Sequence, residues 1–260
     1  MRIRAAVAVV SGALALSAFA VPAAQADEVQ GDTKISNVVV NGGKAVVVSA
    51  TGSKTFTVSF TVTDDSGVNW AEAILYHGAN IDDSDSGAVA NTDDYRSTCT
   101  KVNATTSNCK ASYTIDPGYN ASLNKLAGSW KVWAIATGKD ADHVQKDNAK
   151  TFQVQRLSKL TANAAPEPVK KGKTITVTGK LTRANWETGT YGGYASQPVK
   201  LQFRKKGSST YTTLKTVKTD SKGNLKTTTT ASADGYYRYS FAGTSTTPAV
   251  SATGDYIDVQ

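Results

Sequence analysis

The sequence predicts an all-β protein that is built from two β-sandwich domains in tandem. Thr, Ser, Gly, Val and Ala dominate its composition, and there is a single Met. No long segment shows the 3.6-residue periodicity of an amphipathic helix. Several short stretches instead alternate apolar and polar residues and end at turn residues, which is typical of strands. The three observations together favour sandwiches over any helical fold.

The first 26 residues predict a signal peptide. Arg2 and Arg4 precede an apolar run, and residues 24–26 match the A-x-A cleavage signature. We expect cleavage before Asp27 by the general secretory route, because the two arginines are not adjacent. A retained membrane anchor is the alternative, but the run is marginally short for a membrane span. The sequence therefore predicts a secreted, extracellular protein that is not embedded in a membrane after cleavage.

The first domain is expected over residues 27–156. Residues 54–62 alternate strictly, which directs the apolar side chains of this stretch toward a core and its Thr and Ser side chains toward water. Residues 130–136 carry large side chains on both faces, which predicts a central strand. Other strands are expected at 71–77, at 111–115 and around Phe152 and Val154.

The second domain is expected over residues 169–260. A linker is predicted at 157–168, because Pro166 and Pro168 cannot donate hydrogen bonds to a β-ladder. The alternating residues and regular turn signals of the second domain predict strands at 174–179, 199–204, 236–241 and 255–260.

The two domains carry opposite net charges. Residues 27–156 hold 12 Lys and Arg against 15 Asp and Glu, a net of −3, whereas residues 157–260 hold 15 against 6, a net of +9. A basic extracellular domain fits anionic cell-wall polymers, and the simpler interpretation is that its lysines aid solubility and block edge pairing. Nucleic acid is not an expected partner, since an exported chain with no recognisable binding motif gives no reason for it.

The two cysteines predict a disulfide. Cys99 and Cys109 bracket a short loop before an expected strand, and an exported protein folds in an oxidising compartment. A bond between them would close a hairpin or loop end. A redox-active pair is the alternative, but the C-x9-C spacing does not resemble a C-x-x-C motif.

Phrases in both halves resemble known modules. TFTVSFTVTDDSGV, AEAILYHG and GSWKVWAIATGKDAD are similar to bacterial immunoglobulin-like or fibronectin-like sandwiches. VKKGKTITVTGKL, QPVKLQFRKKGSSTYTTLKTVKTDSKGNLKT and DGYYRYSFAGTSTTPAVSATGDYIDV resemble a module that recurs in secreted actinobacterial proteins. With the signal peptide, the chain resembles Streptomyces-type secreted proteins of uncharacterised role, some of them labelled calcium-binding. The resemblance implies two immunoglobulin-like domains and no catalytic residues.

Residues 82–93, DDSDSGAVANTD, match the spacing of a twelve-residue calcium loop. Gly87 falls at the sixth position, where such loops turn tightly around six to eight oxygen ligands. In this register the ligands would come from Asp82, Ser84, Ser86, Ala88 and Asp93. The pattern therefore predicts a Ca²⁺ site of low affinity, with a dissociation constant of ~10⁻⁴–10⁻³ M as in extracellular modules.

This calcium hypothesis has two competitors. Asp, Ser and Gly are also the ordinary turn residues, so the stretch can be a polar loop without an ion. A sandwich end is a second place for a cation, with Asp64 and Asp65 or Asp140 and Asp142 as ligands. Because the flanks of residues 82–93 read as strand and loop, no EF-hand pair of helices is expected.

The second domain offers candidates for binding polyanions or glycans. Trp186, Tyr191 and Tyr194 lie in a Gly-rich segment, where exposed rings would stack on sugars and packed rings would cap the core. The basic candidates are Lys170, Lys171, Lys173, Arg204, Lys205 and Lys206, and their simpler interpretation is a solvated surface.

The sequence favours a non-enzymatic binding protein over an enzyme. His77 and His143 are the only histidines, and neither H-E-x-x-H nor G-x-S-x-G occurs. The leading hypothesis is a secreted interaction protein with a weak Ca²⁺ loop in its first domain. The alternative is a wall-associated module that binds anionic polymers or glycans through the basic second domain, and a hydrolase ranks third. Cell-wall polymer and extracellular protein are the expected partners; the sequence says nothing of the oligomeric state.

Overall fold

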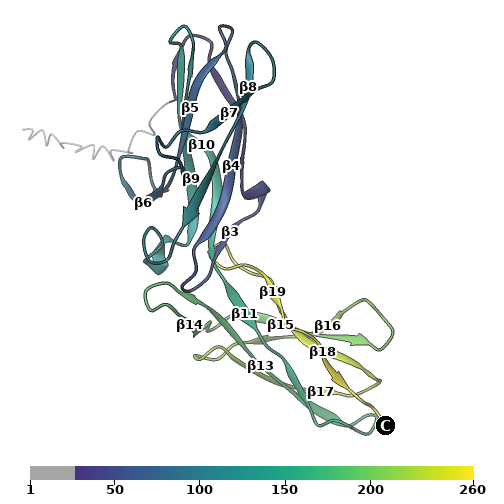
Figure 1. Ribbon diagram of the computed structural model, residues 1–260. Coiled ribbons are helices and arrows are strands. Elements are labelled where there is room, and N and C mark those ends of the chain that lie inside the picture. Colours follow the sequence, from purple (N-terminus) through teal and green to yellow (C-terminus); the bar gives the residue numbers. More distant parts are fainter. Residues whose placement is uncertain (1–26) are drawn as a thin grey trace, which may run out of the picture.

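The computed structural model describes residues 27–260, and in it two β-sandwiches follow one another along the long axis of the molecule (Figure 1). The predicted signal peptide, residues 1–26, lies outside the described residues. Within residues 27–260, no helix is long and apolar enough to cross a membrane. The fold is all-β, as the composition and the alternating stretches predict.

The first sandwich has two sheets, in which every strand pair is antiparallel except β3 with β10. One sheet has the order β1 (Glu28–Gln30), β10 (His143–Arg156), β9 (Gly128–Gly138), β5 (Val68–Gly78) and β6 (Ser84–Ala88), with β3 (Val46–Val48) parallel to β10. The other has the order β2 (Lys34–Val40), β4 (Lys54–Thr63), β8 (Thr106–Ile115) and β7 (Thr98–Lys101). Two single turns, η1 (Asn41–Gly43) and η2 (Asn124–Leu126), lie in the connections. Because successive strands cross between the two sheets as in immunoglobulin domains, the first domain is an immunoglobulin-like sandwich.

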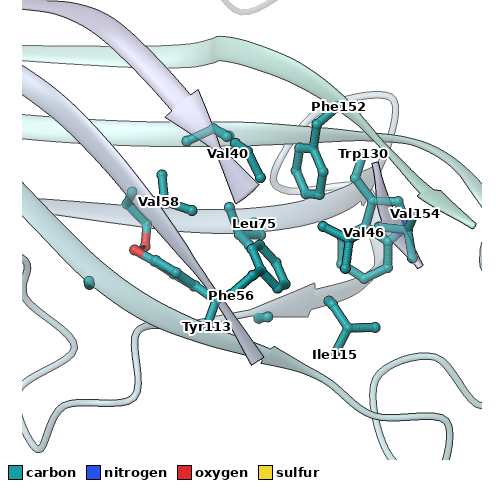
Figure 2. Close-up of a cluster of buried hydrophobic side chains, with 14 of the residues drawn as sticks. Val40, Val46, Phe56, Val58, Leu75, Tyr113, Ile115, Trp130, Phe152 and Val154 are labelled. Atoms are coloured by element: carbon teal, nitrogen blue, oxygen red, sulfur yellow. Dashed lines mark hydrogen bonds between the residues drawn. The ribbon is translucent and has the colours of Figure 1, made fainter. Parts of the chain in front are cut away.

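The core of the first sandwich follows from the period of two along each strand. On β4 the four apolar side chains that alternate along the strand are all buried, while the Thr and Ser side chains between them are partly or fully exposed. Figure 2 shows Phe56 and Val58 of β4 among Tyr113, Trp130 and Phe152 from other strands. The strand predicted at 54–62 and the inward direction of its apolar residues are confirmed.

The predicted central strand and the predicted disulfide are both present. β9 lies between β10 and β5, and its Trp130 is fully buried, with the indole N–H donating to the Leu126 carbonyl at 2.8 Å. Cys99 of β7 and Cys109 of β8 lie directly opposite each other, with Cα atoms 4.0 Å apart, and are joined by a disulfide. The bond therefore joins two neighbouring strands within one sheet.

The second sandwich is smaller. In its first sheet, β13 (Thr174–Asn185) pairs with β11 (Ser158–Leu160), β12 (Asn163–Ala165), β14 (Thr190–Gly193) and β17 (Asn224–Thr230). The second sheet has the order β16 (Thr212–Lys218), β15 (Pro198–Lys205) and β18 (Gly235–Phe241), and β18 also pairs with β19 (Val250–Ser251) and β20 (Asp255–Ile257). Ile175, Leu201 and Tyr239 lie in its separate core, so this domain too is an immunoglobulin-like sandwich.

Residues 157–168 are not the free linker that the two prolines suggested. β11 and β12 fall within this range and both pair with β13 of the second domain. Leu160 and Ala164 are buried in the second core. The prolines follow β12 rather than interrupting it, so the ladder loses no donor. The second domain therefore begins at its first strand, almost directly after β10 ends at Arg156.

A tryptophan closes the junction between the two sandwiches. Trp186 follows β13 of the second domain, yet its side chain packs into the core of the first and is only 4 % exposed. Its indole N–H donates to the Ser49 carbonyl at 3.0 Å. Beside it, the buried Arg156 donates from Nε to the Ala184 carbonyl at 2.6 Å. Burial, with Arg183 nearby, lowers the pKa of Arg156 to about 10, so the group stays charged at neutral pH.

The junction generates the first prediction. Trp186→Ala removes a buried aromatic side chain, a change that costs about 3–5 kcal/mol in protein cores. We expect calorimetry to show lower overall stability and two separated unfolding transitions, because the domains lose their shared contact. Trp186→Phe, which keeps a ring but loses the bond to Ser49, should lie between the variant and the parent. An unchanged transition in Trp186→Ala would show that the domains are stable without this contact.

Candidate functional site

The stretch predicted to wrap around calcium is extended instead. Ser84 to Ala88 form β6, the edge strand that pairs with β5. Gly87, expected to make the tight turn, lies opposite Tyr76 in this ladder and is not among the glycines with a positive φ. Since a strand advances ~3.3 Å per residue, Ser84 and Ala88 lie roughly 13 Å apart. Ligands of one Ca²⁺ ion lie within ~2.6 Å of it, so this register does not form a single cage.

The polar side chains of β6 have other partners. Asp85 accepts a 2.6 Å hydrogen bond with His77 Nδ1 and a 3.0 Å bond from Lys125 Nζ. Burial alone would raise the pKa of Asp85, but the bonds to His77 and Lys125 outweigh it and lower the pKa. Ser86 donates from Oγ to the Asn120 carbonyl at 2.5 Å. Strand pairing and cross-strand bonds therefore account for these residues without an ion.

Aspartates gather instead at one end of the first sandwich, where the sequence offered its second cation hypothesis. Ligand atoms of Asp32, Asp64 and Asp142 lie within 4.8 Å of one another, and so do those of Asp64, Asp65 and Asp140. We call these five residues the acidic end. The turn after β4 carries Asp64 and Asp65, and the turn after β9 carries Asp140 and Asp142. The turn between β1 and β2 adds Asp32, which had no signal in the sequence because it follows a strand of only three residues.

Hydrogen bonds inside the protein already satisfy the central carboxylate of the acidic end. Asp64 is 2 % exposed, and its two oxygens accept bonds from Thr33 Oγ1 at 2.5 Å and from Ser66 N and Oγ at 3.0 and 2.5 Å. Burial raises the pKa of Asp64, but these bonds outweigh it and the net pKa is lowered. The exposed Asp65 shows the opposite: its pKa is raised, first by the negative charge of Asp32. Calcium binding at the acidic end stays a prediction.

The three aromatic candidates of the second domain do not form a sugar platform. Trp186 is buried at the junction, so its ring is not open to a ligand. Tyr191 lies partly buried against the first core and under Lys159, whose Nζ is 3.7 Å from the ring centroid. Tyr194 is stacked by Arg183 at 3.9 Å and meets Phe241 edge-on. For these rings the packing interpretation of the Gly-rich segment holds.

A different set of rings and cations covers the outer face of the second sheet of this domain. Arg204 lies over Tyr236 at 4.1 Å and over Tyr211 at 5.3 Å, and Arg238 lies over Tyr211 at 3.7 Å. Lys206 continues the row over Tyr256 at 5.5 Å, and the Tyr236 and Tyr256 ring centroids are 5.2 Å apart. We call this row the Arg–Tyr ladder; its members are Arg204, Lys206, Tyr211, Tyr236, Arg238 and Tyr256.

Strand register explains the ladder. Tyr237, Tyr239 and Phe241 of β18 point into the core, so Tyr236 and Arg238 point outward. Arg204 of β15 pairs with Tyr236, and Gln202 pairs with Arg238 and accepts a hydrogen bond from its Nε at 2.9 Å. The outward residues of neighbouring strands thus form rows across the sheet, and the cations fall between the rings.

The sequence identified part of this surface. Arg204 and Lys206 were candidates and lie in the ladder, whereas Lys205 is an exposed neighbour. Lys170, Lys171 and Lys173 lie in the exposed turn before β13, where the Lys171 amide donates to the Gln260 carbonyl. Arg238 and the three tyrosines were missed, although alternation along the strand predicted at 236–241 placed Arg238 and Tyr236 outward. Tyr211 and Tyr256 come from other segments of the chain, and only the folded sheet places their rings beside the cations of the ladder.

Comparison with known proteins adds little to this geometry. No family model and no curated protein matches the chain. Among solved structures, a chimeric titin Z1Z2 is 12 % identical, with 90 % of this chain and 98 % of that chain covered and a TM-score of 0.24. The D00-D0 domain of intimin is 14 % identical over 86 % of this chain and 98 % of that chain, with a TM-score of 0.27. The fold assignment rests on the strand order described above, and we draw nothing about function from likenesses this distant.

The second prediction concerns Asp64 and pH. Its lowered pKa means that its carboxylate contributes stability above the unfolded-state pKa of about 3.9 and loses that contribution as the pH falls through the folded-state value. We expect Asp64→Asn to lower the free energy of unfolding by about 1–3 kcal/mol at pH 7, because an amide cannot accept all the bonds of the carboxylate. The difference from the parent should shrink in urea titrations below pH 4. A difference that is constant with pH would contradict this role.

The third prediction tests the calcium loop. Because residues 84–88 are paired as a strand, we expect Asp82→Ala with Asp93→Ala to leave any effect of millimolar CaCl₂ on the melting temperature unchanged. The parent and this variant would be melted in CaCl₂, in MgCl₂ and in EGTA. A Ca²⁺-specific rise in the parent that disappears in the variant would restore the cage predicted from DDSDSGAVANTD.

Proposed function

We propose that this protein is a non-enzymatic extracellular binding protein, and that its second domain holds an anionic polymer on the Arg–Tyr ladder. The observation that carries the proposal is the row of cations stacked on tyrosine rings across one sheet face. Such a row combines positive charge with flat apolar surface, and both are repeated along one direction.

The two arginine charges of the ladder are available to a partner. In the part of the chain that the structure describes, neither Arg204 nor Arg238 forms an ion pair with a carboxylate. Lys206 has a carboxylate, Asp234, at 3.5 Å, and the hydrogen bond with Tyr256 and this contact together raise the pKa of Lys206. The raised pKa keeps Lys206 charged at neutral pH, and arginine side chains do not deprotonate in proteins. The domain around them has a net charge of +9 over residues 157–260.

The arginines are also held in place. Arg238 is fixed by its bond to Gln202, and Arg204 donates from Nη1 to the Ser208 carbonyl at 2.6 Å. Stacking on the tyrosines limits their remaining freedom, so less side-chain entropy is lost when a ligand binds. A guanidinium fixed in this way offers a planar fork that matches carboxylate and phosphate groups.

The dimensions favour a polymer over a small anion. The ladder crosses β15, β18 and β20, and neighbouring strands lie about 4.8 Å apart, so it extends over roughly 10 Å. A chain with repeated negative groups contacts several cations at once, whereas a single small anion contacts one or two. A second group of exposed lysines, Lys170, Lys171 and Lys173, lies near the end of this row, where the Lys171 amide donates to the Gln260 carbonyl. The neighbouring residue Val259 donates its amide to Asp234, which is the carboxylate that contacts Lys206. These lysines extend the positive surface beyond the ladder.

The fourth prediction tests the ladder directly with polyphosphate and polygalacturonate as probes. Arg204→Ala with Arg238→Ala should weaken binding about tenfold and lower the slope of log affinity against log salt by about 2, one for each lost contact. The matched control is Lys180→Ala with Lys226→Ala, which removes two exposed cations from the opposite sheet. Calorimetric titration over a range of salt concentrations measures both quantities.

The control decides the interpretation. We expect the control pair to change the affinity by less than about twofold at about 0.15 M salt, since charges farther from the ligand than the Debye length are screened there. Equal losses in the two pairs would mean that polyanions sense only the net charge of the domain, and the ladder would not be a site. Binding that EGTA abolishes would also contradict the proposal, because the side chains of the ladder bind a polyanion without a metal ion.

A further inference from the structure

A hollow of about 510 Å³ opens on the first domain, away from the ladder and the acidic end. It lies between the end of β6 and the end of β8, and Ile74 of β5 forms part of its floor. Its rim holds two of the large exposed apolar side chains of the domain, Tyr119 at 82 % and Val89 at 41 % exposed. The volume is in the range of about 300–1,000 Å³ that is typical of small-molecule sites.

The loop that carries Tyr119 is tightly held. The Asp116 amide donates to Asn120 Oδ1 at 2.8 Å, and Asn120 Nδ2 donates to the Thr114 carbonyl at 3.0 Å. The Ser86 hydroxyl of β6 donates to the Asn120 carbonyl, which ties the loop to the opposite wall. Because the loop is held by these hydrogen bonds, the 82 % exposure of the Tyr119 side chain does not result from a disordered loop. The loop therefore holds the backbone of Tyr119 at the rim.

The polar groups of the hollow are mostly acceptors. Asn91 donates from Nδ2 to Thr114 Oγ1 at 2.9 Å, and Asp116 Oδ1 accepts from the Gly118 amide at 2.6 Å. Within the described chain, the side-chain oxygen of Asn91, Oδ1, and the second carboxylate oxygen of Asp116, Oδ2, accept no hydrogen bond from the protein. The hollow therefore combines an exposed aromatic ring, an apolar floor and acceptor oxygens.

From this combination we infer that the Tyr119 hollow binds a neutral pyranose ring of a glycan. A pyranose has an apolar C–H face that packs on an aromatic ring, and its edge carries hydroxyl donors that acceptor oxygens satisfy. No Lys or Arg lines the hollow, and its only charged lining residue is Asp116. An anionic sugar would therefore be repelled here, which separates this site from the Arg–Tyr ladder in its chemistry as well as in its domain.

The experiment is an NMR titration of the whole protein with three neutral probes: cellotriose, maltotriose and chitotriose (tri-N-acetyl). At about 10 mM, a concentration that detects millimolar binding, at least one probe should shift the backbone amides of Gly87, Asn91 and Tyr119. Saturation transfer to the ring C–H protons of that sugar should show that its apolar face makes the contact.

Two variants and a matched control make the result specific. Tyr119→Ala should weaken the binding about tenfold, the size found when a stacking ring is removed from base-binding sites. Tyr119→Phe should bind within about threefold of the parent, because the ring stays. Tyr95→Ala removes another exposed tyrosine of the same domain, 53 % exposed and outside the hollow, and should bind as the parent does.

Three outcomes would overturn the inference. The first is that no probe shifts these amides at this concentration. The second is equal weakening by Tyr119→Ala and Tyr95→Ala, which would mean nonspecific contact with exposed rings. The third is stronger binding of polygalacturonate than of the neutral probes at these same amides. None of these outcomes bears on the ladder, whose variants are in the other domain.

Discussion

The strict alternation of side chains along each strand is the constraint on which both proposed sites depend. In β18, three aromatic side chains must point inward to fill the second core, and this commits Tyr236 and Arg238 to the outer face. The pairing of β15 with β18 then places Arg204 beside Tyr236. A slip of one residue would bury Arg238 and expose Tyr237 and Tyr239, so the same hydrophobic burial that stabilises the domain also fixes the ladder.

Sequence patterns identified those parts of the fold that depend on local alternation. The strand at 54–62, the central strand with Trp130 and the disulfide between Cys99 and Cys109 all follow from residues close together in the chain. β6 did not follow, because Asp, Ser and Gly are rare in strands. It exists because the edge of β5 offers backbone partners and because His77 and Lys125 form hydrogen bonds with Asp85, which are contacts that the local pattern of β6 does not contain.

In the candidate sites, too, single residues could be predicted from the sequence, whereas their neighbours in space could not. Arg204 and Lys206 stood out as basic residues, but their tyrosine partners lie on β18, on β20 and in the segment before β16, and they meet only through the sheet. The sequence left open whether Trp186 faces a ligand or caps a core, and the core that buries it belongs to the first domain, which the loop sequence does not reveal. Tyr119 had no signal at all, since an exposed tyrosine in a loop becomes informative only when the hollow beside it is known.

The junction at Trp186 makes the arrangement of the two surfaces consequential. Since the indole ring of one domain is packed in the core of the other, the ladder and the Tyr119 hollow belong to domains that are held together by a packed, hydrogen-bonded contact. Two weak sites on joined domains bind one long ligand more tightly than either does alone, provided that the ligand can reach both. A polymer with neutral sugar rings and separate anionic groups meets that condition, whereas a purely anionic or a purely neutral chain engages one domain only. The difference in chemistry between the two proposed sites therefore predicts selectivity for mixed polymers over affinity for either component.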